Sequence, residues 1–221
     1  MVPKVTNHQK INMTKQFGFW ALKLSAVITF IFIITILYPE IKSEYSLISS
    51  IAPERPWTLV THIFLHSGFL HLWSNLFGLA VFGSILEFYI GSKKFLFLFF
   101  LAGIFAGVAS IFIYNSVIGA SGAIFGLLGT LAVIRPKQVV WVLGVPMYMV
   151  AAAFVWAALD FIGLFNSGNI ANAAHLVGLG VGIIAGLEMR ARIPRHVKQK
   201  KGEIGFSKKY FDKWEHRWMD R

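Results

Sequence analysis

Residues 170–187 read IANAAHLVGLGVGIIAGL, an apolar stretch with a single ionisable side chain, His175. A helix needs about 20 mostly apolar residues to cross the hydrocarbon layer of a membrane, and this stretch has nearly that length. Glycines recur at every fourth position, at Gly178, Gly182 and Gly186. Such a stripe of small residues lets two helix backbones approach closely inside a bilayer. The stretch therefore predicts a membrane helix packed tightly against a neighbour.

Five further apolar stretches precede this one, and together they predict a membrane protein. Of the 221 residues, 56% are hydrophobic and only 14% are charged, which leaves too few polar residues to cover a water-soluble globule. We predict an all-α, polytopic bundle of six transmembrane helices, at Phe19–Tyr38, His71–Ile90, Phe95–Tyr114, Val117–Ile134, Val139–Leu159 and Ile170–Leu187. The sequence has no cysteine, so disulfides and thiolate metal sites are excluded.

Basic residues predict which side of the membrane each end of the chain faces. The sequence carries 21 Lys and Arg against 10 Asp and Glu. The basic residues cluster at both ends and in the turns near Lys93 and Arg135. Such clusters remain on the cytoplasmic side, and six spans with cytoplasmic termini place every cluster there. We therefore predict a cytoplasmic amino end (1–16), a six-helix membrane domain (17–189) and a basic cytoplasmic tail (190–221). The amino end is neither Arg-rich nor Ser-rich, as an organellar transit peptide would be, so we expect a prokaryotic cytoplasmic membrane.

The connection between the first two predicted spans, residues 39–70, is long and unusually apolar. It contains Trp57, Leu59, Val60 and Ile63 where a solvated loop would be polar. This composition predicts a segment partly embedded in the membrane interface, with Trp57 at the level of the headgroups.

A serine and a histidine on different spans lie at matching depth. Ser121 precedes Arg135 by 14 residues, which places it about 21 Å above the inner boundary of the membrane. His175 precedes Arg190 by 15 residues, or about 22 Å. A serine hydroxyl becomes a good nucleophile when a neighbouring base accepts its proton, so this pair predicts nucleophilic catalysis inside the bilayer.

The surroundings of Ser121 fit such chemistry. It stands in Gly119-Ala-Ser-Gly122, at the expected start of a helix whose first N–H groups lack partners. His71 and Asn75 share one helix face and could direct donors at an oxyanion formed there. We predict an outward-facing polar cavity lined by His71, Asn75 and His175.

Each of these features also has a structural interpretation. The Gly119–Gly122 string taken alone is typical of helix packing, and a lone membrane histidine often bonds a neighbouring helix. Glu87 is interpreted as structural, paired with a basic group or a water. Asp160 could orient His175 as a triad acid, but a satisfied helix-end carboxylate is the favoured interpretation. His62 and His66 form an HxxxH pair of low specificity, and we predict no metal and no cofactor.

The motifs together resemble those of the rhomboid intramembrane serine proteases. The motifs that carry the resemblance lie between about Trp57 and Gly186, in the order of the family: His66-Ser-Gly-Phe-Leu-His71-Leu-Trp-Ser-Asn75, Leu86-Glu87 with Gly91, Gly119-Ala-Ser121-Gly122 with Phe125 and Gly126, and Ala171-Asn-Ala-Ala-His175-Leu-Val-Gly178 with Gly182. The resemblance implies a six-helix core and cleavage of transmembrane substrates, which enter beside the fifth helix.

The resemblance also implies roles for individual residues. It implies a Ser–His dyad without an acid, with Ser121 as nucleophile and His175 as base. It implies oxyanion donors from His71, Asn75 and the Ser121 backbone, and an aromatic ring, Phe125, stacked on the histidine. Gly119, Gly122 and Gly178 are the supporting glycines. Where many members have Trp-Arg in the first loop, this chain has Trp57-Thr58, so an arginine partner for Glu87 is missing there and Arg55 is a possible substitute.

Alternatives remain at this point. A non-catalytic membrane binding or transport protein, or an inactive relative that binds transmembrane helices, would use the same polar residues as a relay or a recognition site. The tail from Gly205 onward reads either as a basic amphipathic helix on anionic lipid or as a disordered basic segment. The expected partners are transmembrane protein substrates and anionic lipids, and not nucleic acid.

Overall fold

The structure is a computed structural model that describes residues 18–142, 144–165 and 170–191. The predicted amino end (1–16) and residues 192–221 of the predicted tail lie outside the described residues. The described part is mostly helical, with α2 (Trp20–Leu37), α3 (Glu40–Tyr45), α4 (Thr58–Thr61), α5 (Phe69–Gly78), α6 (Ser84–Ile90), α7 (Ser92–Ile111), α8 (Ser121–Ile134), α9 (Met149–Gly163) and α10 (Asn172–Ala191). A π-helical turn, η3 (Leu79–Gly83), joins α5 to α6 without a break.

Every predicted span contains a helix, but the helices differ in length. Within the described ranges, four helices are long and apolar enough to cross a membrane: α2, the continuous Phe69–Ile90, α7 and α10. The apolar helices α8 and α9 are shorter, with 14 and 15 residues. These lengths and compositions, with their many exposed apolar side chains, are those of an integral membrane protein.

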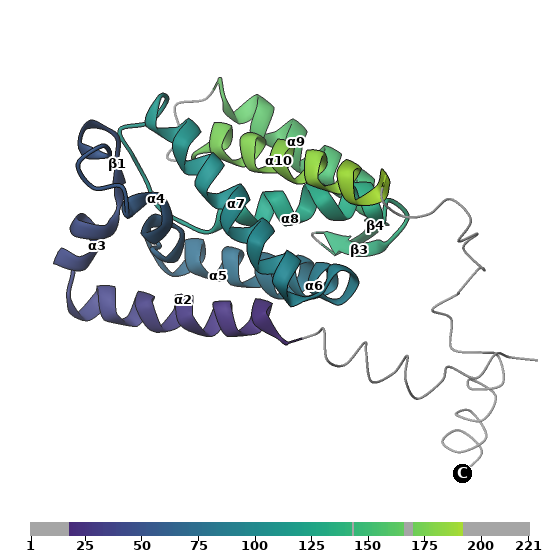
Figure 1. The fold of residues 1–221 in the computed structure, drawn as a ribbon, viewed down its shortest axis with the longest axis horizontal. Helices are drawn as coiled ribbons and strands as arrows, with labels where there is room; N and C mark the ends of the chain where they lie inside the picture. Colours follow the sequence, from purple (N-terminus) through teal and green to yellow (C-terminus); the bar gives the residue numbers. More distant parts are fainter. Residues whose placement is uncertain (1–17, 143, 166–169, 192–221) are drawn as a thin grey trace, which may run out of the picture. The chain divides into compact units, whose positions relative to one another are not determined.

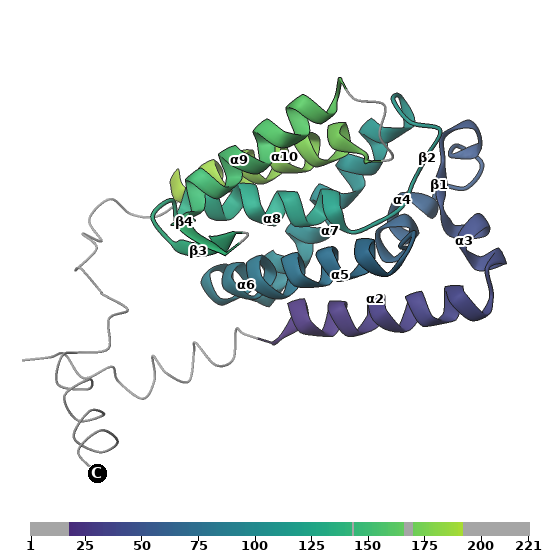
Figure 2. The same cartoon turned by 180° about the vertical axis from the view of Figure 1, so that it is seen from behind.

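Helix α8 forms the centre of the bundle, and the other long helices lie around it (Figures 1 and 2). Ten of its 14 residues are buried. Glycines make this packing possible: a Cβ added at Gly126 would lie 2.3 Å from the Cβ of Ala102 on α7, and one at Gly178 would lie 2.0 Å from the carbonyl oxygen of Gly122. The predicted close approach of the two glycine-bearing helices is confirmed, and it fixes the start of α8 against α10.

The predicted helix over residues 139–148 is wrong. The strands β3 (Val139–Val142) and β4 (Val145–Tyr148) form an antiparallel hairpin there, and α9 begins only at Met149. The two strands are rich in β-branched and aromatic residues, Pro146 cannot donate a backbone hydrogen bond to a helix, and Gly144 takes a positive φ of 81° at the turn. Apolar composition alone therefore overestimated the fifth helix by ten residues.

The predicted fourth span is also shorter than expected. Val117 belongs to a strand, β2 (Ser116–Val117), which pairs antiparallel with β1 (Leu47–Ile48) of the first loop. The helix begins at Ser121, so the serine does open a helix as the sequence predicts. The described chain is mostly helical, as predicted, and two small two-stranded sheets accompany the helices.

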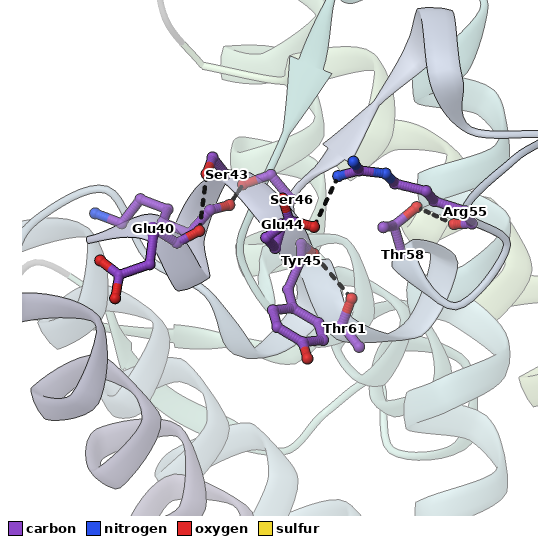
Figure 3. Close-up of polar contacts among 9 residues, drawn as sticks. Glu40, Ser43, Glu44, Tyr45, Ser46, Arg55, Thr58 and Thr61 are labelled. Carbon is purple, nitrogen blue, oxygen red and sulfur yellow. Dashed lines mark hydrogen bonds and ion pairs between the residues drawn. The ribbon is translucent and has the colours of Figure 1, made fainter. Parts of the chain in front are cut away.

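The first loop is ordered by short helices and local hydrogen bonds (Figure 3). The Thr61 hydroxyl donates to the carbonyl of Tyr45 at 2.8 Å, and Arg55 pairs with Glu44 at 3.2 Å. Arg55 therefore has a partner within the loop and does not substitute for the missing arginine near Glu87.

Glu87 instead binds the beginning of α2. Its carboxylate accepts backbone N–H bonds from Gly18, Trp20 and Ala21 at 3.0–3.1 Å, and a bond from the Ser92 hydroxyl at 2.6 Å. The structural interpretation of Glu87 is confirmed, and its partners are backbone N–H groups and a hydroxyl in place of a basic group. A carboxylate is favourable there because the N-terminus of a helix carries partial positive charge.

Candidate active site

Ser121 stands at the first position of α8, directly after a tight turn. Gly119 adopts a φ of 122°, a conformation that L side chains rarely take, and its N–H donates to the carbonyl of His62 at 2.8 Å. A Cβ at Gly119 would also lie 2.7 Å from Nε2 of His71. The turn therefore requires glycine at position 119 for two reasons: its backbone conformation and the close approach of the His71 ring.

The imidazole of His175 meets the Ser121 hydroxyl. Nε2 of His175 lies 2.7 Å from Oγ of Ser121, although 54 residues separate them. The ring of Phe125, one turn along α8, stacks on the imidazole with centroids 4.4 Å apart and an interplanar angle of 12°. The Tyr114 hydroxyl accepts the N–H of Ala173 at 3.0 Å and so holds the start of α10. The serine, the histidine and the aromatic ring predicted from the sequence therefore come together.

Asp160 occupies the other edge of the His175 ring, where the favoured sequence interpretation did not place it. Its Oδ1 lies 3.0 Å from Nδ1 of His175, and only 9% of the Asp160 side chain is exposed. The carboxylate does lie at the end of a helix, but its partner is His175, so the expectation of a histidine without an acidic neighbour is corrected. Ser121, His175 and Asp160 form a continuous chain of hydrogen bonds.

His71 approaches the serine turn from α5. Its Nδ1 accepts the backbone N–H of Ser67 at 3.4 Å and lies 3.0 Å from the Ser67 hydroxyl. A backbone N–H can only donate, so these contacts favour a ring whose proton is on Nε2, the atom beside Gly119. Ser67 was not predicted as a site residue, although it precedes His71 by four residues, just before α5 begins at Phe69.

Asn75 makes a different contact from the one expected. Its Nδ2 donates to the backbone carbonyl of His71 at 2.7 Å, within the same helix, and its buried Oδ1 has no partner among the described residues. The amide retains a second N–H. Of the two side chains predicted as oxyanion donors, His71 lies at the turn of Gly119, whereas Asn75 bonds within its own helix.

A small cavity adjoins Ser121. Its volume of about 10 Å³ suffices for about one water molecule. Its lining includes His62, Gly119, Gly122 and Ala174. The lining does not include His71, Asn75 or His175, so the cavity found here is not the one that the sequence predicts.

His62 and His66 do not converge as metal ligands. The Nδ1 of His62 bonds the carbonyl of Thr58 at 2.8 Å, whereas the ring of His66 packs edge-on against that of His71 with centroids 4.9 Å apart. Among residues 18–142, 144–165 and 170–191, no group of three His, Cys, Asp or Glu could hold a metal. Burial lowers the pKa of His62 to about 4 and that of His66 to about 3, so both rings are neutral near pH 7.

Comparisons with known proteins place this arrangement in a family. Residues 53–192, more than half of the chain, match the family model for the Rhomboid domain. The chain is 27% identical over 171 residues to the rhomboid protease GlpG of Photorhabdus laumondii and 31% identical over 131 residues to that of Haemophilus influenzae. It is 30% identical over 129 residues to the GlpG of Yersinia pseudotuberculosis.

These alignments cover 74%, 59% and 58% of this chain, respectively. They cover 60%, 68% and 46% of the relatives, so the chain spans about half to two thirds of their length. Ser121, His175, Asp160 and His71 all fall within the matched domain. From the extent of that match, the chain belongs to the rhomboid family.

Proposed function

We propose that this protein is an intramembrane serine endopeptidase that cleaves transmembrane segments of other membrane proteins. The observation that carries the proposal is the 2.7 Å hydrogen bond between Oγ of Ser121 and Nε2 of His175. A nucleophile within hydrogen-bond reach of a base is the arrangement that covalent catalysis needs. The likeness to the rhomboid protease GlpG of several bacteria supports the same activity.

In the proposed reaction, His175 takes the proton of Ser121 as Oγ attacks a substrate carbonyl. A tetrahedral intermediate forms, and His175 then gives the proton to the leaving amine. Water subsequently attacks the acyl-enzyme by the same route, releasing the new carboxyl terminus and restoring the serine. Phe125 limits the imidazole to one plane, so the base stays aligned with Oγ throughout.

The negative oxygen of the intermediate needs donors that are already in place. The first N–H groups of α8 lack intrahelical acceptors, which makes the Ser121 N–H the first candidate. The Nε2–H of His71 beside Gly119 is the second, and the free N–H of Asn75 is the third. Gly119 and Gly122 leave room for the substrate backbone at this point.

The short length of α8 supports a position of Ser121 below the outer surface of the membrane. Its 14 residues extend about 21 Å, less than the roughly 30 Å of the hydrocarbon layer. If α8 ends at the cytoplasmic boundary near Arg135, Ser121 lies inside the bilayer and opens toward the outer side. Both termini are then cytoplasmic, in a prokaryotic cytoplasmic membrane.

A substrate helix hides its carbonyl groups in its own hydrogen bonds and must unwind before cleavage. Substrates with Gly or Pro near the cleaved bond should therefore be preferred. We place their lateral entry beside α9, which carries Asp160 at its far end and begins only after the β3–β4 hairpin. No metal or cofactor takes part in the proposed reaction.

The test uses purified protein in liposomes with a fluorogenic transmembrane substrate and a fluorophosphonate probe. Ser121→Ala and His175→Ala should each abolish cleavage, because the two side chains act as one unit. Mass spectrometry should find the probe on Ser121 of the folded wild type. Cleavage that persists in Ser121→Ala would refute Ser121 as the nucleophile. A wild-type protein that neither cleaves the substrate nor takes the probe would favour a transport or helix-binding protein instead.

A further inference from the structure

Asp160 is a buried carboxylate that the Ser121–His175 pair alone does not require. The residue is only 7% exposed, and among the described residues its carboxylate bonds Nδ1 of His175, at 3.0 Å. Its second oxygen, Oδ2, is buried without a partner among the described residues. Burying a carboxylate costs free energy unless it is paired and hydrogen-bonded, and here the bond to His175 is the compensation that the structure shows.

The place of Asp160 in its helix adds to this cost. It lies in the last turn of α9, which ends at Gly163. The C-terminus of a helix carries partial negative charge, so a carboxylate there is repelled. Helix stability therefore does not explain an acid at this position, whereas a bond to the histidine of a catalytic pair does.

The end of α9 also packs closely against the beginning of α10. A Cβ added at Gly163 would lie 2.5 Å from Nδ2 of Asn172, the first residue of α10. The absence of a side chain at Gly163 lets the two helix ends meet one turn from both Asp160 and His175. The Asp160–His175 bond thus joins two backbones that are held in contact next to it.

We propose that Asp160 is a positioning residue that keeps the proton of neutral His175 on Nδ1, an inference that rests on the proposed protease function. A carboxylate can only accept a hydrogen bond, so Nδ1 must donate to it. Nε2 is then unprotonated and can accept the proton of Ser121. Of the two neutral forms of the ring, only this one can act as the base.

The proton balance of the step is simple. As Oγ of Ser121 attacks, its proton moves to Nε2, and His175 becomes an imidazolium with an N–H on each nitrogen. Asp160 stays ionised, accepts no proton and interacts with the new positive charge through the Nδ1–H bond. When the leaving amine takes the proton from Nε2, the starting arrangement returns.

The decisive variant is Asp160→Asn, because an amide N–H can donate to Nδ1 and shift the ring proton to Nε2. We expect kcat to fall at least about 100-fold, with KM changed less than about threefold. The protein should be labelled with ¹⁵N-histidine, and the His175 resonances assigned by their loss in His175→Gln. The ¹⁵N shifts should report Nδ1–H in the wild type and Nε2–H in Asp160→Asn. Asp160→Glu, which retains a carboxylate, should keep the Nδ1–H form and regain part of the rate.

Thr130→Val is the matched control. Thr130 is a buried polar residue whose hydroxyl donates across to the carbonyl of Gly182 at 2.8 Å, far along α8 from the serine. This variant should lower the melting temperature in detergent without moving the His175 shifts. A purely structural role for Asp160 would make its variants behave like this control.

The outcomes separate this inference from the function on which it rests. If Ser121→Ala is inactive while Asp160→Asn keeps kcat within about threefold, the protease stands and the role of Asp160 is refuted. An Nε2–H tautomer in the wild type refutes it too, and this measurement needs no Asp160 variant to fold. Cleavage that persists in Ser121→Ala would instead refute the serine mechanism on which the inference rests.

Discussion

The carbonyl oxygen of Gly126 on α8 lies only 1.9 Å from where a Cβ on Gly182 of α10 would stand. No side chain fits between these two residues, so the backbones of the two helices are in direct contact. This contact lies one turn beyond the equally close approach of Gly122 and Gly178, and both hold the helix of Ser121 against the helix of His175.

Replacing Gly182 by alanine should therefore separate α8 from α10. We expect a loss of roughly 2–3 kcal/mol in the free energy of unfolding and a strong loss of cleavage, because overpacking forces backbones apart. Gly180→Ala is the control, since nothing lies within 4 Å of a Cβ added there. Thermal unfolding in detergent and the liposome assay measure both effects, and equal behaviour of the two variants would contradict the packing described here.

Asn75→Ala tests the oxyanion donors. If the free N–H of Asn75 reaches the intermediate, kcat should fall about 10²- to 10³-fold while KM changes little. The melting temperature should drop only slightly, because the Nδ2 bond to the His71 carbonyl is local to one helix. Ser74→Ala, at an exposed neighbour whose hydroxyl bonds the same carbonyl, is the control for that local bond. A rate in Asn75→Ala equal to that of Ser74→Ala would leave the oxyanion to His71 and the backbone alone.

Glu87→Gln should loosen the beginning of α2. The variant removes the charge from a carboxylate that accepts three backbone N–H bonds and one hydroxyl bond. We expect the free energy of unfolding to fall by about 2 kcal/mol, the range for hydrogen bonds to a charged group. Glu44→Gln, which breaks an exposed pair with Arg55, should cost less than about 1 kcal/mol. Equal melting temperatures for the two variants would refute the capping role.

Acid should destabilise the first loop through His62. Burial lowers the pKa of His62 from 6.5 to about 4, so the unfolded chain binds more protons than the folded one between these values. Stability is therefore complete above about pH 6.5 and falls as the pH drops, by about 2 kcal/mol at pH 5 for this one group. His62→Gln should lessen the fall in melting temperature between pH 7.5 and pH 5. His66, whose pKa is lowered to about 3, retains a similar contribution. An unchanged pH dependence in His62→Gln would show that His62 is already charged in the folded protein.

The pairing of Ser121 with His175 was accessible from the sequence because both lie a similar number of residues from a basic residue at the same expected boundary. Because an α-helix rises by a constant distance per residue, the number of residues between a side chain and that boundary gives its depth in the membrane. The glycine stripes then identified which helices pack together. These features depend on local sequence and on counting along a helix, and the structure agrees with both.

The contact of Asp160 with His175 could not be obtained in the same way. Its depth depends on where α9 begins, and an apolar run does not distinguish a helix from a strand over a few residues. The hairpin at 139–148 displaced that start by ten residues. The position of Ser67 beside His71 likewise depends on how the chain enters α5, which periodicity does not specify.

The hairpin has a consequence for the lipid beside it. With only 15 residues, α9 extends about 22 Å, and its outer face exposes Phe154, Phe161 and Ile162. Acyl chains that cover this face must shorten or tilt to match a helix several ångströms shorter than an ordinary bilayer. We expect the bilayer to be thinner along this side, which would bring water closer to the ends of a substrate helix that passes there.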